Sequence, residues 1–179
     1  MILGLDISTT CVGLCVLDNK GNVLLLDHII LSKIKTGLRD KATAVKEKLE
    51  NINDQFDIKY IFIEECLLRF RMGASSIHTL MTLAKFNGVI SYIASEIFDI
   101  IPCYFLAPHA RKVCGVKITK EEKKEKGIKQ IVLNHVKNEL GDGLDMFYTR
   151  TNKPKPYMFD RSDSWIIAKC GYLKQILQN

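Results

Sequence analysis

Four carboxylates interrupt or border apolar segments of this sequence, and they form its candidate site for chemistry. Asp6 lies inside an N-terminal apolar run, Glu64 ends a second such run, and Asp160 and Asp163 open a C-terminal segment of helical pattern. Burying a carboxylate in hydrocarbon costs free energy unless a partner compensates its charge. Carboxylates gathered at one point also repel each other, and divalent cations are the usual compensation. The four acids therefore predict a metal-dependent phosphoryl-transfer site.

The expected local structure brings these acids together. Alternation along the first strand places Asp6 on one face with Gly4, and parallel pairing would set Asp6 beside Glu64. A three-residue spacing puts Asp160 and Asp163 on one side of a helix, where the dipole of its N-terminus stabilises negative charge. Four carboxylates could hold two Mg²⁺ ions about 4 Å apart, one activating water and one stabilising the leaving oxygen. No His or Cys is needed, which favours Mg²⁺ or a substituting Mn²⁺ over zinc.

Each acid also has a purely structural interpretation. Asp6 could cap the turn that follows its strand. Glu64 competes with Glu65, although Glu65 should point to the opposite face of the sheet. Asp160 could be a simple helix N-cap, but Asp163, one turn further on, has no such explanation. The position of Asp6 in a central strand favours a catalytic role.

Hydrophobic periodicity predicts a single α/β domain over residues 1–179, without repeats or a linker. Strands are expected at residues 2–8, 12–17, 22–31, 59–65 and 102–107, with a hairpin turn at 18–22 in which Gly and Asn supply positive φ angles. Helices are expected at residues 36–56, 75–98, 120–140 and 160–177, and a loop at 141–158. Three antiparallel strands followed by alternating helices and strands give one mixed sheet flanked by helices.

The helix at residues 75–98 is apolar around more than one stripe. Such a helix is either enclosed in the core or shared with a second subunit. Ser75 or Ser76 is its expected N-cap.

Composition indicates the size of the core and the compartment in which we expect the protein. Its 179 residues are 47% hydrophobic, which suffices for a substantial core. Six cysteines without a CxxC pair or zinc-finger spacing indicate a reducing compartment. We find no signal peptide and no apolar stretch of about 20 residues, so we expect a soluble, intracellular protein without a membrane span.

Positive charge is concentrated in a few segments of a chain whose net charge is +6. A lysine-rich run at residues 117–129 would by itself be a solvated helix face. Beside an acidic metal site it indicates a polyanionic substrate. The candidate backbone contacts are Arg111, Lys112, Lys117, Lys120, Lys123 and Lys124. After Glu64, Phe70 could stack on an unpaired base between Arg69 and Arg71, or it could anchor the next helix.

The order of these residues resembles the RuvC-type Holliday-junction resolvases of the ribonuclease H-like superfamily. The similarity extends over nearly the whole chain, with phage and poxvirus resolvases of similar length as the apparent nearest relatives. It lies in an Asp on the first strand, a Glu ending the fourth and an Asp-x-x-Asp on the last helix, and in the segments at residues 4–8, 63–65, 106–113 and 160–164.

This resemblance implies a five-stranded ribonuclease H-like sheet and a homodimer that binds a four-way DNA junction. It also implies two symmetric nicks that leave 5′-phosphates, with Asp6, Glu64, Asp160 and Asp163 as the metal-binding acids. The segment that contains Arg69, Phe70 and Arg71 matches the part of the family that wedges into the junction centre.

Two departures from the family concern substrate preference. Arg161 and Ser162 lie between the paired aspartates, and Ser164 and Trp165 follow them, where the family has small residues. The loop before the helix is also longer, and it carries the sequence KPKPY at residues 153–157.

Three alternatives remain open. The same acids could cut RNA or an RNA–DNA hybrid. Residues 3–13 also resemble the phosphate-binding start of actin-like sugar kinases, which need a second nucleotide-binding half and usually carry Gly in place of Ser8. A non-catalytic DNA-binding module is the third, although such a module gains nothing from four acids that repel phosphate.

Overall fold

The five strands of the computed structural model form one mixed sheet in the order β3-β2-β1-β4-β5. The structure describes residues 1–66 and 77–175. The strands are β1 (Ile2–Ile7), β2 (Cys11–Leu17), β3 (Val23–Ile30), β4 (Tyr60–Glu64) and β5 (Cys103–Phe105). β1, β2 and β3 pair antiparallel, whereas β4 pairs parallel with both β1 and β5. This confirms the predicted fold class.

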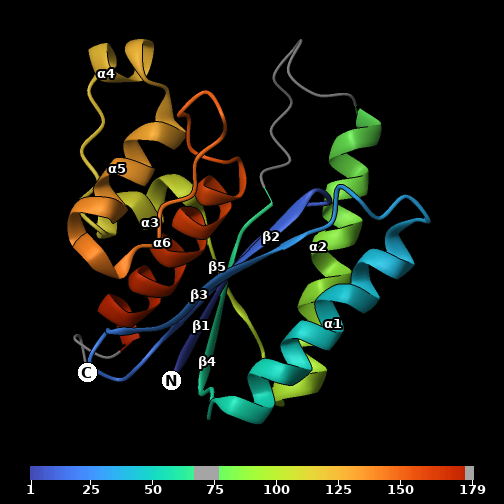
Figure 1. Ribbon diagram of the computed structural model, residues 1–179. Helices are drawn as coiled ribbons and strands as arrows, with labels where there is room; N and C mark the ends of the chain where they lie inside the picture. The colour runs from blue at the N-terminus through green and yellow to red at the C-terminus, as the bar shows by residue number, and fades with distance from the viewer. Residues whose placement is uncertain (67–76, 176–179) are drawn as a thin grey trace.

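Helices cover both faces of the sheet (Figure 1). They are α1 (Leu38–Gln55), α2 (Ile77–Phe98), α3 (Ala107–Val113), α4 (Lys120–Glu125), α5 (Ile128–Leu140) and α6 (Tyr157–Gln175), with a short 3₁₀ turn η1 (Gly141–Gly143). α1 and α2 lie on one face, and α3, α5 and α6 lie on the other. No helix in the described ranges is long and apolar enough to cross a membrane.

The alternation along β1 divides the core into two parts. Leu3 and Leu5 are buried on the α1–α2 side, together with Val45 of α1 and Ile90 of α2. Ile2 belongs to the second core, on the α6 side, where β1 also presents Gly4 and Asp6. Burial of each large apolar side chain contributes about 1.5–3 kcal/mol, so both faces hold β1 rigidly.

Glycines let α6 lie directly on the sheet. A Cβ at Gly4 would come within 2.6 Å of the Cβ of Ala168, and a Cβ at Gly13 would overlap the backbone carbonyl of Asp160. Gly13 pairs with Asp6 across β1 and β2. The absence of a side chain at these two positions therefore lets α6 lie against the sheet from Asp160 to Ala168.

Several predicted boundaries are wrong. The strand expected at residues 102–107 ends at Phe105, and Pro108 lies in the first turn of α3, where proline is favoured because no N–H is needed there. The helix expected at residues 120–140 is divided into α4 and α5 by Gly127, whose φ is 76°.

Two smaller expectations also fail. α6 begins at Tyr157 and not at residue 160, so Asp160 lies inside its first turn, and the alternative that Asp160 is a simple N-cap is wrong. In the β2–β3 turn only Gly21 has a positive φ, and the Asp18 carboxylate holds the turn by accepting hydrogen bonds from the Lys20 and Asn22 amides. The N-cap expected at residues 75–76 lies outside the described residues.

Candidate metal centre

Three carboxylates meet at one end of the sheet. One oxygen from each of Asp6, Glu64 and Asp163 lies within 4.8 Å of the other two. β1 and β4 are parallel, with Leu5 paired to Ile63, so the next residues on the two strands are Asp6 and Glu64. The parallel pairing therefore aligns these two acids, as the sequence predicted.

α6 supplies the third acid of this cluster. The close approach at Gly13, which pairs with Asp6, brings the start of the helix over the end of β1. Asp163 is buried there, with 5% of its surface exposed. The sequence predicted that Asp160 and Asp163 share one side of the helix, and both act electrostatically on Asp6.

Asp160 lies at the border of the cluster and not inside it. Its carboxylate is not among the three whose oxygens converge. It accepts a hydrogen bond from the thiol of Cys11, at the start of β2. The fourth predicted ligand thus stands next to the cluster, within range of its charge.

Burial and mutual repulsion destabilise the ionised acids. Burial, followed by repulsion from Glu64 and Asp163, holds the pKa of Asp6 well above its ordinary value. Burial and the charge of Asp163 raise the pKa of Glu64 to about 7. Burial also raises the pKa of Asp160. These shifts mean that the positive charge near the cluster does not fully compensate its acids.

The donor set fits a hard divalent cation. The three ligand atoms that converge in the cluster are carboxylate oxygens, and oxygen ligands suit Mg²⁺ or Mn²⁺ better than zinc. A cation between Asp6, Glu64 and Asp163 would supply the missing charge. The roles of these residues as ligands remain predictions.

Arg111 of α3 faces the centre. Its Nη2 donates a hydrogen bond to Asp163 Oδ1 at 3.1 Å, and both side chains are largely buried. The sequence predicted a contact to DNA for this residue, and the structure places it in an ion pair with a candidate ligand. The pair Ala107–Pro108 is typical of a helix N-terminus and could have indicated α3, but it carries no signal for the ion pair.

Lys129, in the first turn of α5, is a second cation of the site. Its charge lowers the pKa values of Asp6, Glu64 and Asp160, although its own side chain is exposed. The sequence showed it only as one lysine in a basic run. Its proximity to the acids depends on the break at Gly127, which no spacing rule predicted.

The remaining predicted DNA contacts are five lysines that the structure describes and three residues that it does not. Five lysines are exposed on α3, on α4 and on the segment between them: Lys112, Lys117, Lys120, Lys123 and Lys124. Arg69, Phe70 and Arg71 lie outside the described residues. Contact with nucleic acid remains a prediction for all of these side chains.

Arg161, between the two aspartates, is buried and has no acidic partner among the described residues. Its Nη2 donates to the Leu26 carbonyl at 2.7 Å, and its Nη1 donates to the Asp145 carbonyl at 3.3 Å. Its guanidinium lies 5.7 Å from the centre of the Phe147 ring. This arginine therefore ties β3 and the preceding loop to the first turn of α6.

Comparison with known proteins identifies the fold. No family model and no curated protein matches the sequence. A solved structure of Thermus thermophilus RuvC in complex with Holliday junction substrate has a TM-score of 0.66 at 11% identity, over 98% of this chain and 94% of that one.

Two further solved structures agree. Thermus thermophilus RuvC has a TM-score of 0.63 at 13% identity, over 98% of this chain and 95% of that one. The yeast mitochondrial Holliday junction resolvase Ydc2 has a TM-score of 0.57 at 14% identity, over 99% of this chain and 80% of that one. The chain thus has the ribonuclease H-like fold of RuvC-type resolvases.

Proposed function

We propose that this chain is a metal-dependent endonuclease that resolves four-way or similarly branched DNA junctions. The observation that carries the proposal is the convergence of Asp6, Glu64 and Asp163 oxygens within 4.8 Å at one end of this sheet. The fold it shares with resolvases supports the substrate class. The reaction is hydrolysis of a phosphodiester in two symmetric nicks, each leaving a 5′-phosphate.

The acids would hold the metal, and the cations would hold the substrate. Asp6, Glu64 and Asp163, with Asp160 beside them, would bind two Mg²⁺ ions or Mn²⁺ in their place. Bound divalent cations stabilise charge that develops on phosphate oxygens and lower the pKa of water. Arg111 keeps Asp163 in position through their hydrogen bond.

Substrate binding falls to the exposed lysines of α3, α4 and the segment between them. Contacts of this kind fix the register of a nucleic-acid backbone but carry little sequence information. Recognition would therefore follow the shape of the DNA. Arg69, Phe70 and Arg71 are proposed to reach the junction centre.

A second copy of the chain completes the proposal, because symmetric nicks need two centres. α2 leaves large apolar side chains uncovered: Ile77, Met81, Val89 and Tyr92 are 47–65% exposed. A hollow of about 360 Å³ between α1 and α2 adjoins this face. We place the homodimer interface on this face of α2. We also propose that residues 1–179 form one domain, that the protein is related to phage and poxvirus resolvases, and that it acts inside the cell.

A substrate panel tests this function. Labelled four-way junction, linear duplex, flap and RNA–DNA hybrid are incubated with Mg²⁺ or with a chelator. We expect paired, symmetric nicks in the junction, only with Mg²⁺. Cutting of the hybrid alone would establish the RNA-directed alternative instead.

The substitution Asp6→Asn tests the site. It keeps the shape of the side chain but removes the charge, so cleavage should fall at least about 100-fold. Junction binding should be unchanged, because the exposed lysines are intact. The control Asp54→Asn changes an exposed acid of α1 and should have no effect. Cleavage by Asp6→Asn at the normal rate would remove Asp6 from the site.

A further inference from the structure

Residues 147–155, which precede α6, form a regular hairpin, called here the basic hairpin. The Thr149 amide donates to the Lys153 carbonyl at 2.8 Å, and the Lys155 amide donates to the Phe147 carbonyl at 2.9 Å. Tyr148 and Pro154 form a β-bridge between its two sides. Backbone hydrogen bonds thus define its shape.

The basic hairpin carries uncompensated positive charge. Arg150 and Lys153 are exposed, and Lys155 is half-buried. The sequence contains no acid from residue 146 to residue 159. The ion pairs found among residues 1–66 and 77–175 involve none of these three cations. Like charges held together in this way favour an anionic partner.

Aromatic side chains accompany this charge. Phe147 and Tyr148 are 42% and 43% exposed. Basic residues that alternate with accessible aromatic rings are typical of nucleic-acid contacts, because rings stack on bases while cations bind phosphates.

The base of the hairpin is fixed to the helix that carries the aspartates. Arg161 holds the Asp145 carbonyl and lies over the Phe147 ring. Tyr157 packs 6.0 Å from the Phe147 ring and stacks on His28 at 3.8 Å. The position of the hairpin is therefore set relative to the acidic centre.

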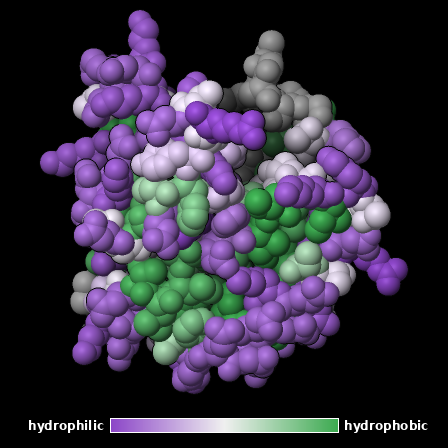
Figure 2. All heavy atoms as spheres, in the orientation of Figure 1, coloured by the Kyte–Doolittle hydropathy of each residue, from purple (hydrophilic) through white to green (hydrophobic). Residues whose placement is uncertain are grey.

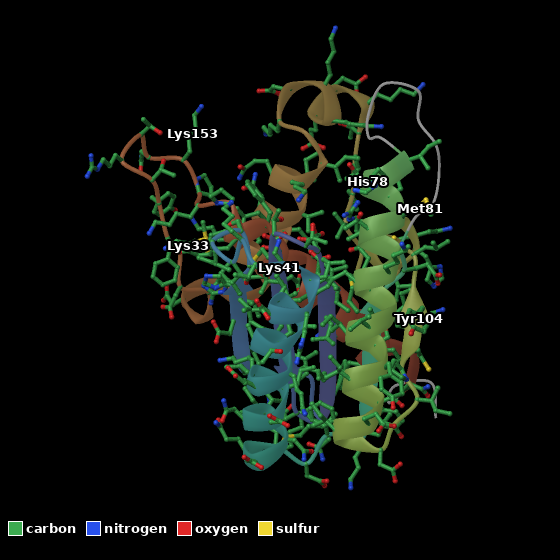
Figure 3. All side chains as sticks on the ribbon, turned by 90° about the vertical axis from the view of Figure 1, so that its right-hand side faces the viewer. Lys33, Lys41, His78, Met81, Tyr104 and Lys153 are labelled. Carbon is green, nitrogen blue, oxygen red and sulfur yellow. The ribbon has the colours of Figure 1, made fainter. Side chains whose placement is uncertain are left out.

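The hairpin and α4 occupy different parts of the surface around this centre. In Figure 3, Lys153 projects from the hairpin on the left, whereas α4 lies at the top. Hydrophilic residues cover both segments in Figure 2. A hollow of about 340 Å³, lined in part by Pro156, Tyr157 and Asp160, connects the base of the hairpin with the border of the acidic cluster.

We propose that the basic hairpin is a second nucleic-acid contact, which binds the phosphodiester backbone of the strand that leaves the acidic centre on the β3 side. Arg150, Lys153 and Lys155 bind phosphates, and Tyr148 packs on a base. The proposal rests on the proposed function in one respect: it takes the substrate of the acidic centre to be DNA.

The test measures junction binding in chelator, where no cutting occurs, over a range of NaCl concentrations. The triple variant Arg150→Gln, Lys153→Gln, Lys155→Gln should bind at least about tenfold more weakly at low salt. The slope of log K against log [NaCl] should decrease by about 2–3, because each phosphate contact contributes about one unit. A matched variant with Lys20→Gln, Lys46→Gln and Lys59→Gln has the same net charge and should keep the wild-type slope.

Tyr148→Ala separates stacking from charge. It should weaken binding about 5- to 100-fold, corresponding to the loss of one stacked base, with an unchanged salt slope. Thermal melting of each variant checks that the fold is intact.

The outcomes distinguish the two proposals. A triple variant with the wild-type slope overturns the hairpin contact, while the nuclease proposal stands if the wild type cuts the junction. A wild type that binds through the hairpin but cuts no substrate overturns the nuclease alone. A wild type that binds no nucleic acid overturns the hairpin contact directly.

Discussion

At the scale of single residues, the folded chain makes ionisation of the acids in this centre unfavourable. Asp6 and Glu64 are the clearest cases, since burial is the largest cause of the raised pKa of each. Folding stabilises the protonated forms of these acids relative to the unfolded chain. A bound cation would reverse that preference.

This arrangement predicts an unusual dependence of stability on pH. The pKa of Glu64 rises from 4.5 in the unfolded chain to about 7 in the folded one, so its contribution is full below about pH 4.5 and is lost as pH rises through 7. In the metal-free protein, Glu64 alone should account for a loss of up to about 3 kcal/mol across that range. Thermal melting from pH 4.5 to 8 measures the loss.

Two controls identify the cause. Mg²⁺ should restore the melting temperature above pH 7, and Glu64→Gln should make the decline shallower, since Asp6 and Asp160 still contribute to it. A Glu64→Gln variant that declines as steeply as the wild type would show that other groups are responsible.

The acids could be predicted from sequence because charge inside an apolar run is visible without any structure. The pairing of Arg111 with Asp163 could not be predicted. It depends on the orientation of α3, a helix of seven residues that is too short to show a period. The position of Arg161 shows the same limit, because its acceptors are backbone carbonyls from β3 and the loop before α6.

At the scale of elements, the contact between α6 and the sheet decides whether a site exists. Gly13 of β2 is the most restrictive position, since a methyl group there would meet the backbone of Asp160 and not a flexible side chain. The helix would have to move away from the strands.

Gly13→Ala is therefore expected to displace the first turn of α6, destabilise the fold by about 1–3 kcal/mol and lower cleavage more than binding. Gly143→Ala, where a Cβ would have open space, is the matched control and should leave both unchanged. Denaturant unfolding and junction cleavage measure the two effects. Full activity in Gly13→Ala would mean that this approach is not required.

Most elements were predictable because each shows a period of its own. Ala42, Val45 and Leu49 of α1 are buried as their spacing implies. The errors occur at glycine and proline. Gly127 divides one expected helix, and Pro108 begins a helix where a stop was expected. A glycine can lie within a helix or break it, and a proline can precede a helix or begin it. Packing decides which of these occurs at Gly127 and Pro108.

At the scale of the whole molecule, the exposed apolar side of α2 is the feature that one copy of the chain does not explain. Met81 is 53% exposed and Tyr92 is 65% exposed. No helix in the described part of the chain has the length and apolarity of a membrane span. A second copy would remove this surface from water.

Met81→Glu combined with Tyr92→Glu should weaken that dimer at least about 30-fold, or about 2 kcal/mol. Light scattering should show the mass change from twice 20.4 kDa to 20.4 kDa. Asn134→Glu on the exposed side of α5 is the control. Junctions should then accumulate with a single nick. An unchanged mass would move the interface elsewhere.

The overall architecture was predictable from the order of strands and acids, although identity to solved resolvases is only 11–14%. The strand order and the acidic centre depend on a few positions, whereas most core residues can change if they remain apolar. The sequence left open whether the helix at residues 75–98 is enclosed in the core or shared with a second subunit, because its apolar pattern does not specify what covers it.

The distance along the chain between Asp6 and Asp163 has a consequence for the cell. During translation β1 is made early and α6 late. The growing polypeptide therefore contains Asp6 and Glu64 well before Asp163 has been added. Incomplete products lack the full cluster. If this protein cuts genomic DNA, the order of translation prevents cleavage until α6 has been made and the three acids can come together.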